Sequence, residues 1–295
     1  MKIKYMNFKN VVLFYFLVIF FISPIDILGE KLLNYKETEP GGNFGNNRKR
    51  KLEVHNYIIV KYYIKTQYTI FEATNRKGIS YIINEGTRYN LTDSFTIQAN
   101  NSIEMHFSSP VKSLYGFFSM DNDRNVENIV SIDLSHFDSS LLENIGYMFN
   151  GCNHLKSVDL SHFDTSLVTN MERMFYGNEQ LKSLNLSNFN TSLVTNMYGM
   201  FYNCNQLESL NLPNFDTSLV TNMYGMFYNC TQLKSLDISN FNTTSVINSS
   251  LMFDGLNSIN FINLYNVKDN NQLKSVLSQF LNNNTNHNII ICQRQ

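Results

Sequence analysis

Residues that could carry chemistry are few in this chain, and they recur at one spacing. His136 and His162 are separated by a 26-residue spacing, and imidazole pairs are a common part of metal sites. No third set of ligands recurs with them, so we expect two solvent-facing turn residues and no metal site. The sequence also lacks G-x-S-x-G, H-E-x-x-H, a phosphate-binding loop and a paired C-x-x-C. We therefore expect no enzymatic activity and no cofactor.

Three of the four cysteines recur at multiples of the same spacing. Cys152, Cys204 and Cys230 occupy one position of the pattern. If neighbouring units stack, Cys204 and Cys230 come close enough in principle for a disulfide bond. We expect free, buried thiols instead, because Asn178 and Leu256 fill the same position in other units and a buried thiol packs as a small apolar group.

Small polar residues form the candidate ligand-binding surface. They stand at two positions of each unit with one residue between them, and an extended chain puts two such side chains on one face. The candidates are Ser157, Asp159, Ser183, Asn185, Ser209, Asn211, Ser235 and Asp237. No aromatic anchor of the kind that dominates protein interfaces stands in these columns. The alternative interpretation is therefore polarity that only keeps the surface soluble.

Eight N-x-S/T motifs are candidate glycosylation sites of an exported chain. Their acceptors are Asn90, Asn100, Asn185, Asn190, Asn229, Asn242, Asn248 and Asn283. The chain contains 44 Asn, so several of these motifs are expected by chance.

Most of these positions belong to an internal repeat, which is the strongest signal in the sequence. Phenylalanine recurs with a 26-residue period at Phe137, Phe163, Phe189, Phe215 and Phe241. Several other columns keep the same spacing without an insertion. Residues 129–267 therefore comprise five 26-residue leucine-rich repeats.

Each repeat predicts one strand and one short helix. Leu210 and Leu212 alternate with polar residues, as in a strand with one buried face. Val220, Met223 and Met226 follow at spacings of three, which predicts one or two helical turns. Stacked repeats predict an α/β solenoid, a leucine-rich-repeat-like right-handed stack. A parallel β-sheet would form one face of it and short helices the other.

The repeat motif resembles a known family. Residues 220–230 (VTNMYGMFYNC) and 237–243 (DISNFNT) are similar to the unit of BspA-like leucine-rich repeats, also catalogued as a domain of unknown function abundant in mycoplasma surface proteins. The resemblance covers about residues 129–267. It implies a surface-displayed protein that takes part in adhesion to host matrix or to other cells. Phe replaces the usual Asn after the strand, so it does not imply a standard asparagine ladder.

The N-terminus predicts export. Three lysines precede an apolar run at residues 11–22, which is the form of a secretory signal. We expect residues 1–29 to be a signal peptide, and the alternative is a retained membrane anchor. Residues 30–52 form a polar and basic linker. Its run at 48–51 (RKRK) is either a solvated charge run or a processing site.

The two ends of the repeat array predict caps. Residues 53–128 contain several short alternating runs, which predict a small β-rich region that covers the first repeat. An independent ligand-binding domain is the rival interpretation. Residues 268–295 predict a C-terminal cap, in which Asp269 begins a helix and the apolar run at 289–291 follows it.

The charge balance limits the choice of partner. The chain has 24 acidic and 23 basic residues, which argues against nucleic acid. We expect a secreted or cell-surface interaction protein that binds a protein, cell-surface or matrix ligand through its repeats and takes no small-molecule substrate. It would contact a membrane only through a retained N-terminal anchor. The alternatives are a structural coat protein with no defined ligand and an enzyme with its site in the N-terminal β region.

Overall fold

The computed structural model describes residues 56–63, 66–69, 78–90, 94–108, 110–120, 124–268, 271–283 and 289–292, which all lie in one compact unit. The predicted signal peptide and linker, residues 1–29 and 30–52, lie outside the described residues. None of the helices in the described part is long and apolar enough to cross a membrane.

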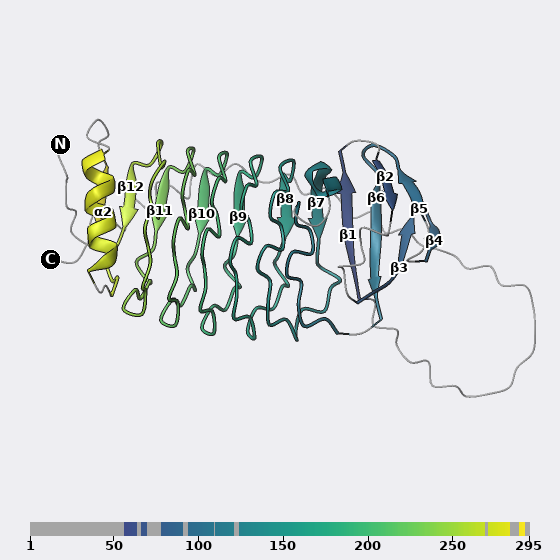
Figure 1. Cartoon of the computed structure of the whole chain (residues 1–295), viewed down its shortest axis with the longest axis horizontal. Helices are drawn as coiled ribbons and strands as arrows, with labels where there is room; N and C mark the ends of the chain where they lie inside the picture. The colour runs from purple at the N-terminus through teal and green to yellow at the C-terminus, as the bar shows by residue number, and fades with distance from the viewer. Residues whose placement is uncertain are drawn as a thin grey trace, which may run out of the picture. The chain divides into compact units, whose positions relative to one another are not determined.

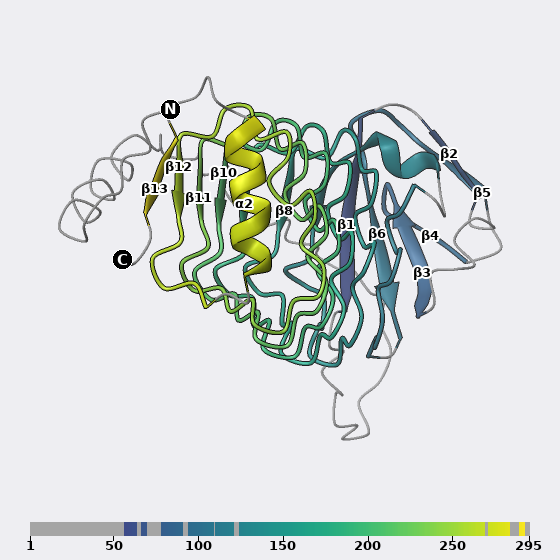
Figure 2. The same ribbon diagram turned by 60° about the vertical axis from the view of Figure 1, so that its left-hand side comes forward.

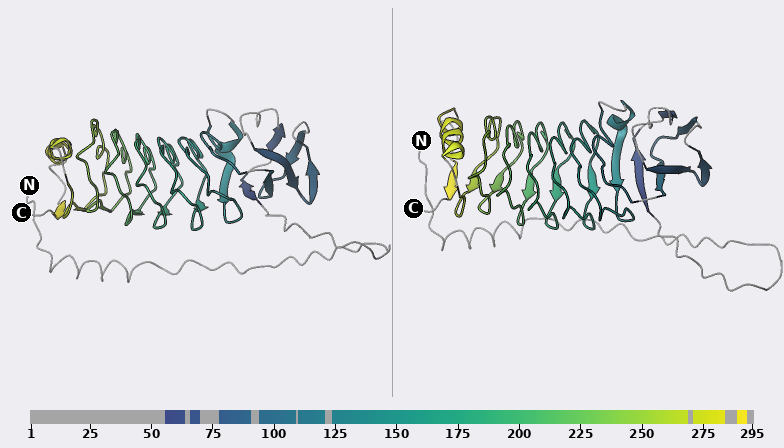
Figure 3. Two further views of the ribbon diagram at one scale, coloured as in Figure 1. Left: turned by 90° about the horizontal axis from the view of Figure 1, so that it is seen from below. Right: turned by 60° about the horizontal axis from the view of Figure 1, so that its bottom comes forward.

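Six strands, one from each successive 26-residue coil, form one long side of the structure (Figure 1). They are β7 (Ile129–Asp133), β8 (Ser157–Asp159), β9 (Ser183–Asn185), β10 (Ser209–Asn211), β11 (Ser235–Asp237) and β12 (Phe261–Asn263). Paired neighbours are parallel and in register, as for Leu184 and Leu210. The coils follow one another in a row (Figure 3). The predicted solenoid with parallel sheets is confirmed, and its handedness stays a prediction.

The short helices predicted for the second side of the solenoid are wrong. That side consists of consecutive turns, which we call the turn segments. The amide of Met174 donates to the carbonyl oxygen of Met171 within the same turn, whereas the amide of Arg173 donates to Tyr198 of the next coil, at 2.8 Å. Arg173 and Gly177 have positive φ values of 50° and 72°, which an α-helix does not accommodate. Successive turns imitate helical spacing, because they also point every third or fourth side chain inward.

Two columns of stacked phenylalanines fill the core between the strands and the turn segments. In one column, the ring centroids of Phe175 and Phe201 lie 5.8 Å apart and those of Phe201 and Phe227 lie 5.7 Å apart. In the other, Phe189 and Phe215 stack at 6.5 Å. All five rings are essentially buried. Each coil thus covers the apolar face of its neighbours, which explains why the predicted columns consist of large residues.

The N-terminal region extends the same sheet. Its strands are β1 (Tyr57–Tyr62), β2 (Thr66–Thr69), β3 (Ile79–Asn84), β4 (Thr87–Tyr89), β5 (Ser94–Ile97) and β6 (Ser102–Phe107). Six strands pair in the order β4-β3-β6-β1-β7-β8, and β1 is antiparallel to β7. β2 and β5 form a separate pair. This continuity supports the capping interpretation over an independent domain.

An additional turn segment precedes the five predicted repeats. The amide of Phe118 donates to the carbonyl oxygen of Met148 at 2.8 Å, and the Phe118 ring stacks on Phe149 at 6.0 Å. The sequence distance from Phe118 to Phe149 is longer than the 26-residue period. The short 3-10 helix Arg124–Asn128 lies in this longer connection. Because of these extra residues, this segment does not keep the 26-residue period of the repeats.

The C-terminal cap has the predicted helix, and the apolar run that follows it forms a strand. Helix α2 (Gln272–Asn283) buries Leu273, Leu277 and Phe280, and the Phe280 ring lies 6.1 Å from Phe253 of the last turn segment. Strand β13 (Ile290–Cys292) pairs in parallel with β12. Figure 2 shows both elements at the end of the row of coils. The predicted first residue of the helix, Asp269, lies outside the described residues.

A buried hydroxyl links each coil to the next at the turn after the strand. The hydroxyl of Thr217 donates to the carbonyl oxygen of Asn242 at 2.9 Å and accepts the amide of the same residue at 2.8 Å. Thr165 makes the same pair of bonds to Asn190. One side chain thereby satisfies both backbone groups of a residue in the following coil, as burial requires.

Replacing Thr217 by Val should lower the free energy of unfolding by about 1–3 kcal/mol, because the isostere leaves buried backbone groups without a partner. Urea denaturation of the full chain measures this. Thr221→Val is the matched control: its hydroxyl donates to Thr195 from an exposed position, so the change should stay within about 0.5 kcal/mol. Equal losses in both variants would contradict this account of the buried hydroxyl.

Candidate binding surface

The structure places the eight predicted polar residues on the parallel strands β8 to β11 of four successive coils. Ser183 pairs with Ser209 and Asn185 with Asn211, so the two columns run straight across neighbouring coils. The members on β8, β9 and β10 are exposed, and Ser235 and Asp237 on β11 are half-buried. We call these two columns the polar columns. Each also has a further member on β7, Ser131 and Asp133, which the sequence interpretation did not include.

The Asp and Asn column has a structural function as well. The Asp159 Oδ1 atom accepts the amide of Ser161 at 2.9 Å, which is an Asx turn that ends the strand. Hydrogen bonds from Ser161 and the charge of His162 hold the pKa of Asp159 below its usual value. Asn211 is an exception, because the residue two positions later is Pro213, which has no amide to donate. One oxygen of most members is therefore committed to the fold.

A row of stacked rings occupies the N-terminal part of the same face. The His106 ring lies 4.5 Å from Tyr81 and 4.9 Å from Tyr57 between centroids. The guanidinium of Arg88 lies 3.8 Å from the centre of the Tyr81 ring, and His136 stacks on the other side of Tyr57 at 4.6 Å. We call these five residues the aromatic row. It runs along strands β4, β3, β6 and β1 toward the polar columns.

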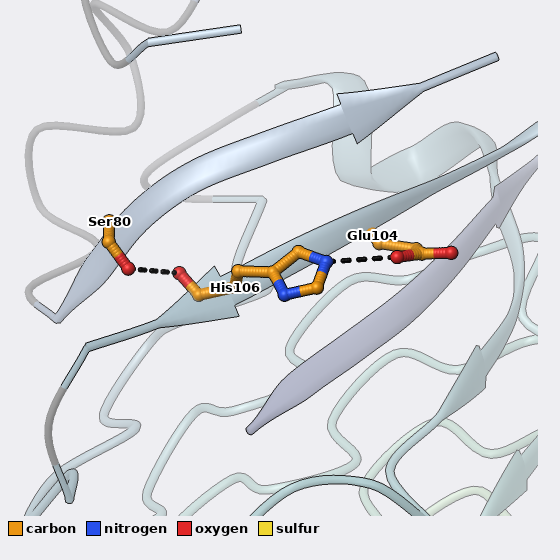
Figure 4. A network of polar contacts seen from close by, with 3 residues as sticks. All are labelled: Ser80, Glu104 and His106. Atoms are coloured by element: carbon orange, nitrogen blue, oxygen red, sulfur yellow. Dashed lines mark hydrogen bonds and ion pairs between the residues drawn. The ribbon is translucent and has the colours of Figure 1, made fainter. Parts of the chain in front are cut away.

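Figure 4 shows Ser80, Glu104 and His106 connected by hydrogen bonds, a combination that resembles a hydrolytic triad. The imidazole Nε2 of His106 lies 2.9 Å from a Glu104 carboxylate oxygen. The Ser80 hydroxyl, however, donates to the backbone carbonyl oxygen of His106 and not to the ring. An imidazole that does not contact the hydroxyl cannot take its proton, so this arrangement is not a nucleophile with its base.

The Glu104 and His106 pair belongs to the packing of the aromatic row. The His106 side chain is only 11% exposed, so a neighbouring carboxylate satisfies its ring nitrogen. Burial, and secondarily the charges of Glu104 and Asp133, raise the pKa of Tyr57 above its usual value. The Tyr57 hydroxyl thus stays protonated at neutral pH and can donate a hydrogen bond.

The sequence contains a signal for the aromatic row that the interpretation missed. Tyr57 and Tyr81 are the outward residues of strands that alternate between half-buried and buried positions. The alternation predicts on which face each ring lies. It does not predict that β6 inserts between β1 and β3, and this pairing brings His106 between the two tyrosines.

The two histidines singled out by their spacing have different surroundings. His136 belongs to the aromatic row, whereas His162 lies near the Asp159 carboxylate. In the part of the chain that the structure describes, no group of three His, Cys, Asp or Glu side chains could hold a metal ion.

The column of cysteines consists of free, buried thiols that connect neighbouring coils. The thiol of Cys204 donates to the carbonyl oxygen of Phe175 at 3.1 Å, and that of Cys230 donates to Phe201 at 3.1 Å. The Asn178 amide makes the equivalent bond to Phe149. This shared donor function explains why Asn178 can replace Cys at this position. All four cysteines are free, so the structure does not contain the alternative disulfide.

Several glycosylation motifs coincide with Asx turns. Asn190 accepts the amide and the hydroxyl of Ser192, and Asn242 does the same with Thr244. Asp164 and Ser166 form the equivalent turn with an acid in place of Asn. The N-x-S/T pattern therefore follows from turn chemistry, whether or not a glycan is attached. The other acceptors include Asn90, Asn100 and Asn283, which are exposed, and Asn229, which donates to Asn203.

This geometry defines a class of protein, a repeat β-solenoid whose sheet continues into a capping region. Comparison with protein families matches residues 90–183, 112–212 and 178–289 to the family described as Mycoplasma protein of unknown function, DUF285. These matches span more than half of the chain, and the chain belongs to this family. The comparisons with curated proteins and with solved structures give no match.

At pH 9, iodoacetamide should label none of Cys152, Cys204 and Cys230 in the native protein, and all of them after unfolding without a reductant. Burial raises the pKa of Cys230 to about 12 and that of Cys204 well above its usual value, so neither thiol ionises nor meets the reagent. Intact-mass spectrometry counts the adducts. If the unfolded chain lacked two adducts before reduction and gained them after it, the result would instead establish a Cys204–Cys230 disulfide.

Proposed function

We propose that this protein is a secreted or cell-surface interaction protein, non-enzymatic, that binds a protein partner on cells or matrix through the outer face of its sheet. One observation carries the proposal: the sheet runs from β4 to β8 without interruption, so the aromatic row shares a surface with the β7 and β8 members of the polar columns. The members on β9, β10 and β11 continue these columns in the coils that follow. Export would use the N-terminal segment, as a cleaved signal or as an anchor.

The aromatic row supplies the anchor that the polar columns lack. Tyr and Arg are enriched among the residues that dominate binding energy. Stacking holds Tyr57, Tyr81 and Arg88 in place, which reduces the side-chain entropy that binding costs. The polar columns would add weaker contacts, one set for each coil, along an extended partner.

Beads coated with the full chain and washed over an epithelial cell monolayer test the proposal. The double variant Tyr81→Ala/Arg88→Ala should lower bead retention at least about threefold, because it removes the anchor. Ser183→Lys/Asn211→Lys should lower it by obstructing the polar columns. Both strand positions are exposed and Asn211 forms no Asx turn, so the fold should persist.

Thr195→Ala, an exposed change on the connection after the strand, is the matched control and should retain as many beads as the wild type. Thermal unfolding verifies that each variant is folded. Undiminished retention by both folded double variants would contradict binding through the sheet.

A second candidate function, a coat protein whose copies pack side by side, is favoured by a column of exposed leucines. Leu141, Leu167, Leu193 and Leu219 are 40–49% exposed at equivalent positions of four successive coils. Such a stripe presents roughly 300 Å² of apolar surface, a size at which patches are often functional. Two copies with the same rise per coil could align their stripes.

In that case, sedimentation velocity of the full chain should detect self-association that Leu167→Gln/Leu193→Gln abolishes, because the change replaces apolar contacts with solvated amides. The single variant Leu141→Gln, at the end of the stripe, should weaken association less. A wild-type chain that sediments as a monomer at all concentrations up to about 100 μM would contradict lateral packing.

A further inference from the structure

A cluster of tyrosines around one arginine lies on the outer side of the turn segments. In the coil that contains Arg173, the side chains of Met171, Met174 and Phe175 face the core. Those of Arg173 and Tyr176 face outward. These outward positions belong to the turn segments and not to the strands, so they are separate from the face used by the proposed function. We call the cluster the tyrosine–arginine cluster: Tyr147, Arg173, Tyr176, Tyr198, Tyr202, Tyr224 and Tyr228.

Arg173 is the centre of the cluster. Its guanidinium carbon lies 5.4 Å, 5.0 Å and 4.9 Å from the ring centres of Tyr147, Tyr176 and Tyr198. One terminal nitrogen donates to the Tyr198 hydroxyl at 3.1 Å. The buried Nε has no hydrogen-bond partner among the described residues. Three rings thus hold the cation in one orientation with donors still unused.

The charge of Arg173 is not neutralised within the described residues. The ion pairs found there involve other side chains, and none includes Arg173. Its sequence neighbour Glu172 does not form an ion pair with it. The two Glu172 oxygens instead accept the hydroxyl of Tyr147, which belongs to the cluster, and the Asn196 amide, each at 3.1 Å. A partly buried cation without a carboxylate favours an anionic group from outside the chain.

The tyrosines extend the cluster along the solenoid. Tyr176, Tyr202 and Tyr228 stack at 4.7 Å and 4.3 Å, and Tyr198 stacks on Tyr224 at 5.3 Å. Burial raises the pKa of Tyr202 to about 12, so its hydroxyl remains protonated. Stacking covers most ring faces, so the surface consists of ring edges and hydroxyl groups that recur once per coil.

Asn203 and Asn229 follow Tyr202 and Tyr228 in the chain, and the Asn229 amide donates to the Asn203 side-chain oxygen at 2.9 Å. Hydroxyl groups, amides and aromatic C–H edges in a fixed, repeating row match the hydroxyl groups and apolar C–H faces of a sugar chain. The surroundings therefore favour a sugar over a peptide as the carrier of the anionic group.

We propose that the tyrosine–arginine cluster binds an acidic oligosaccharide. A carboxylate or sulfate group pairs with Arg173, and the adjoining sugar rings lie along Tyr198, Tyr202 and Tyr228. The site lies on the turn segments, so it works independently of the sheet surface and gives the protein a second kind of ligand.

Isothermal titration of the full chain with three oligosaccharides of equal length tests the proposal. Hyaluronan carries carboxylates only, chondroitin sulfate also carries sulfates, and chitin oligosaccharide is neutral. At least one acidic chain should bind about tenfold or more tightly than the neutral chain, because charged hydrogen bonds to Arg173 are made only with an anion. The two acidic probes distinguish carboxylate from sulfate as the preferred group.

Variants then locate the site. Arg173→Gln should lower the affinity about tenfold, and Arg173→Lys should restore only part of it, because Lys keeps the charge but loses the planar fork. Tyr198→Phe keeps the ring and removes the acceptor that orients Arg173, so a smaller loss is expected. Lys274→Gln is the matched control, because it removes an exposed cation on helix α2, outside both surfaces, and it should bind as the wild type does.

Three results would overturn the proposal: no binding of either acidic chain, equal affinity for the neutral chain, or binding that Arg173→Gln leaves unchanged in a folded protein. Equal affinity for a poly-glutamate peptide would also overturn it, in favour of a protein ligand. Bead adhesion measures the proposed function of the sheet face and not oligosaccharide binding. The variants that test the sheet face leave this cluster intact, so the two proposals can fail independently.

Discussion

The hydrogen bonds between successive turn segments are the interaction on which the rest of the structure depends. In each segment alternate amides bond within their own turn, and the others donate to the next coil, as Arg173, Phe175 and Gly177 do. No coil can satisfy these groups alone, and a buried amide without a partner is costly. The 26-residue register must therefore hold along the whole array. An insertion within a coil would break several bonds at once, whereas the longer connection before β7 lies outside these ladders.

This register turns single side chains into continuous columns with distinct functions. Inward columns of Phe and Met form the core, and buried Thr hydroxyls and Cys thiols donate across coils. Asn and Asp side chains form the Asx turns at the ends of the straight segments. One coil contains three such turns, at Asp159, Asp164 and Asn170. Asn188 adds a ladder of its own, because its amide donates to the carbonyl oxygens of Leu160 and Phe163. The Asn content thus reflects the architecture, and even the polar column on the strand surface serves the fold in part.

Much of the fold could be predicted because a repeat reports the same position several times. The strand at Leu210 and the inward Met and Phe columns were predicted correctly on that basis. The C-terminal helix lies outside the repeats and was predicted correctly from its own apolar pattern. The short helices were wrong, since inward spacings of three and four residues are shared by a helix and by a series of turns. Residues at positive φ, such as Gly177 and Asn203, distinguish the series of turns from a helix, because they interrupt helical hydrogen bonding. The tyrosine columns have the same 26-residue spacing as the Phe columns, although they extend over only two or three coils, and spacing alone does not say whether a ring faces the core or the solvent.

The sequence by itself determined the period, the parallel stacking, the membership of each column and the positions of the polar strand residues. These follow from local pattern and from the need of every coil to cover its neighbour. Only the tertiary structure decided how the N-terminal strands join the first coil, because their pairing order β3-β6-β1-β7 is not the chain order. That order assembles the aromatic row from residues as distant in the chain as Tyr57 and His136. The tertiary structure likewise placed Arg173 among tyrosines of three successive coils. The direction of a side chain on a turn depends on φ values, which the spacing of residues does not reveal.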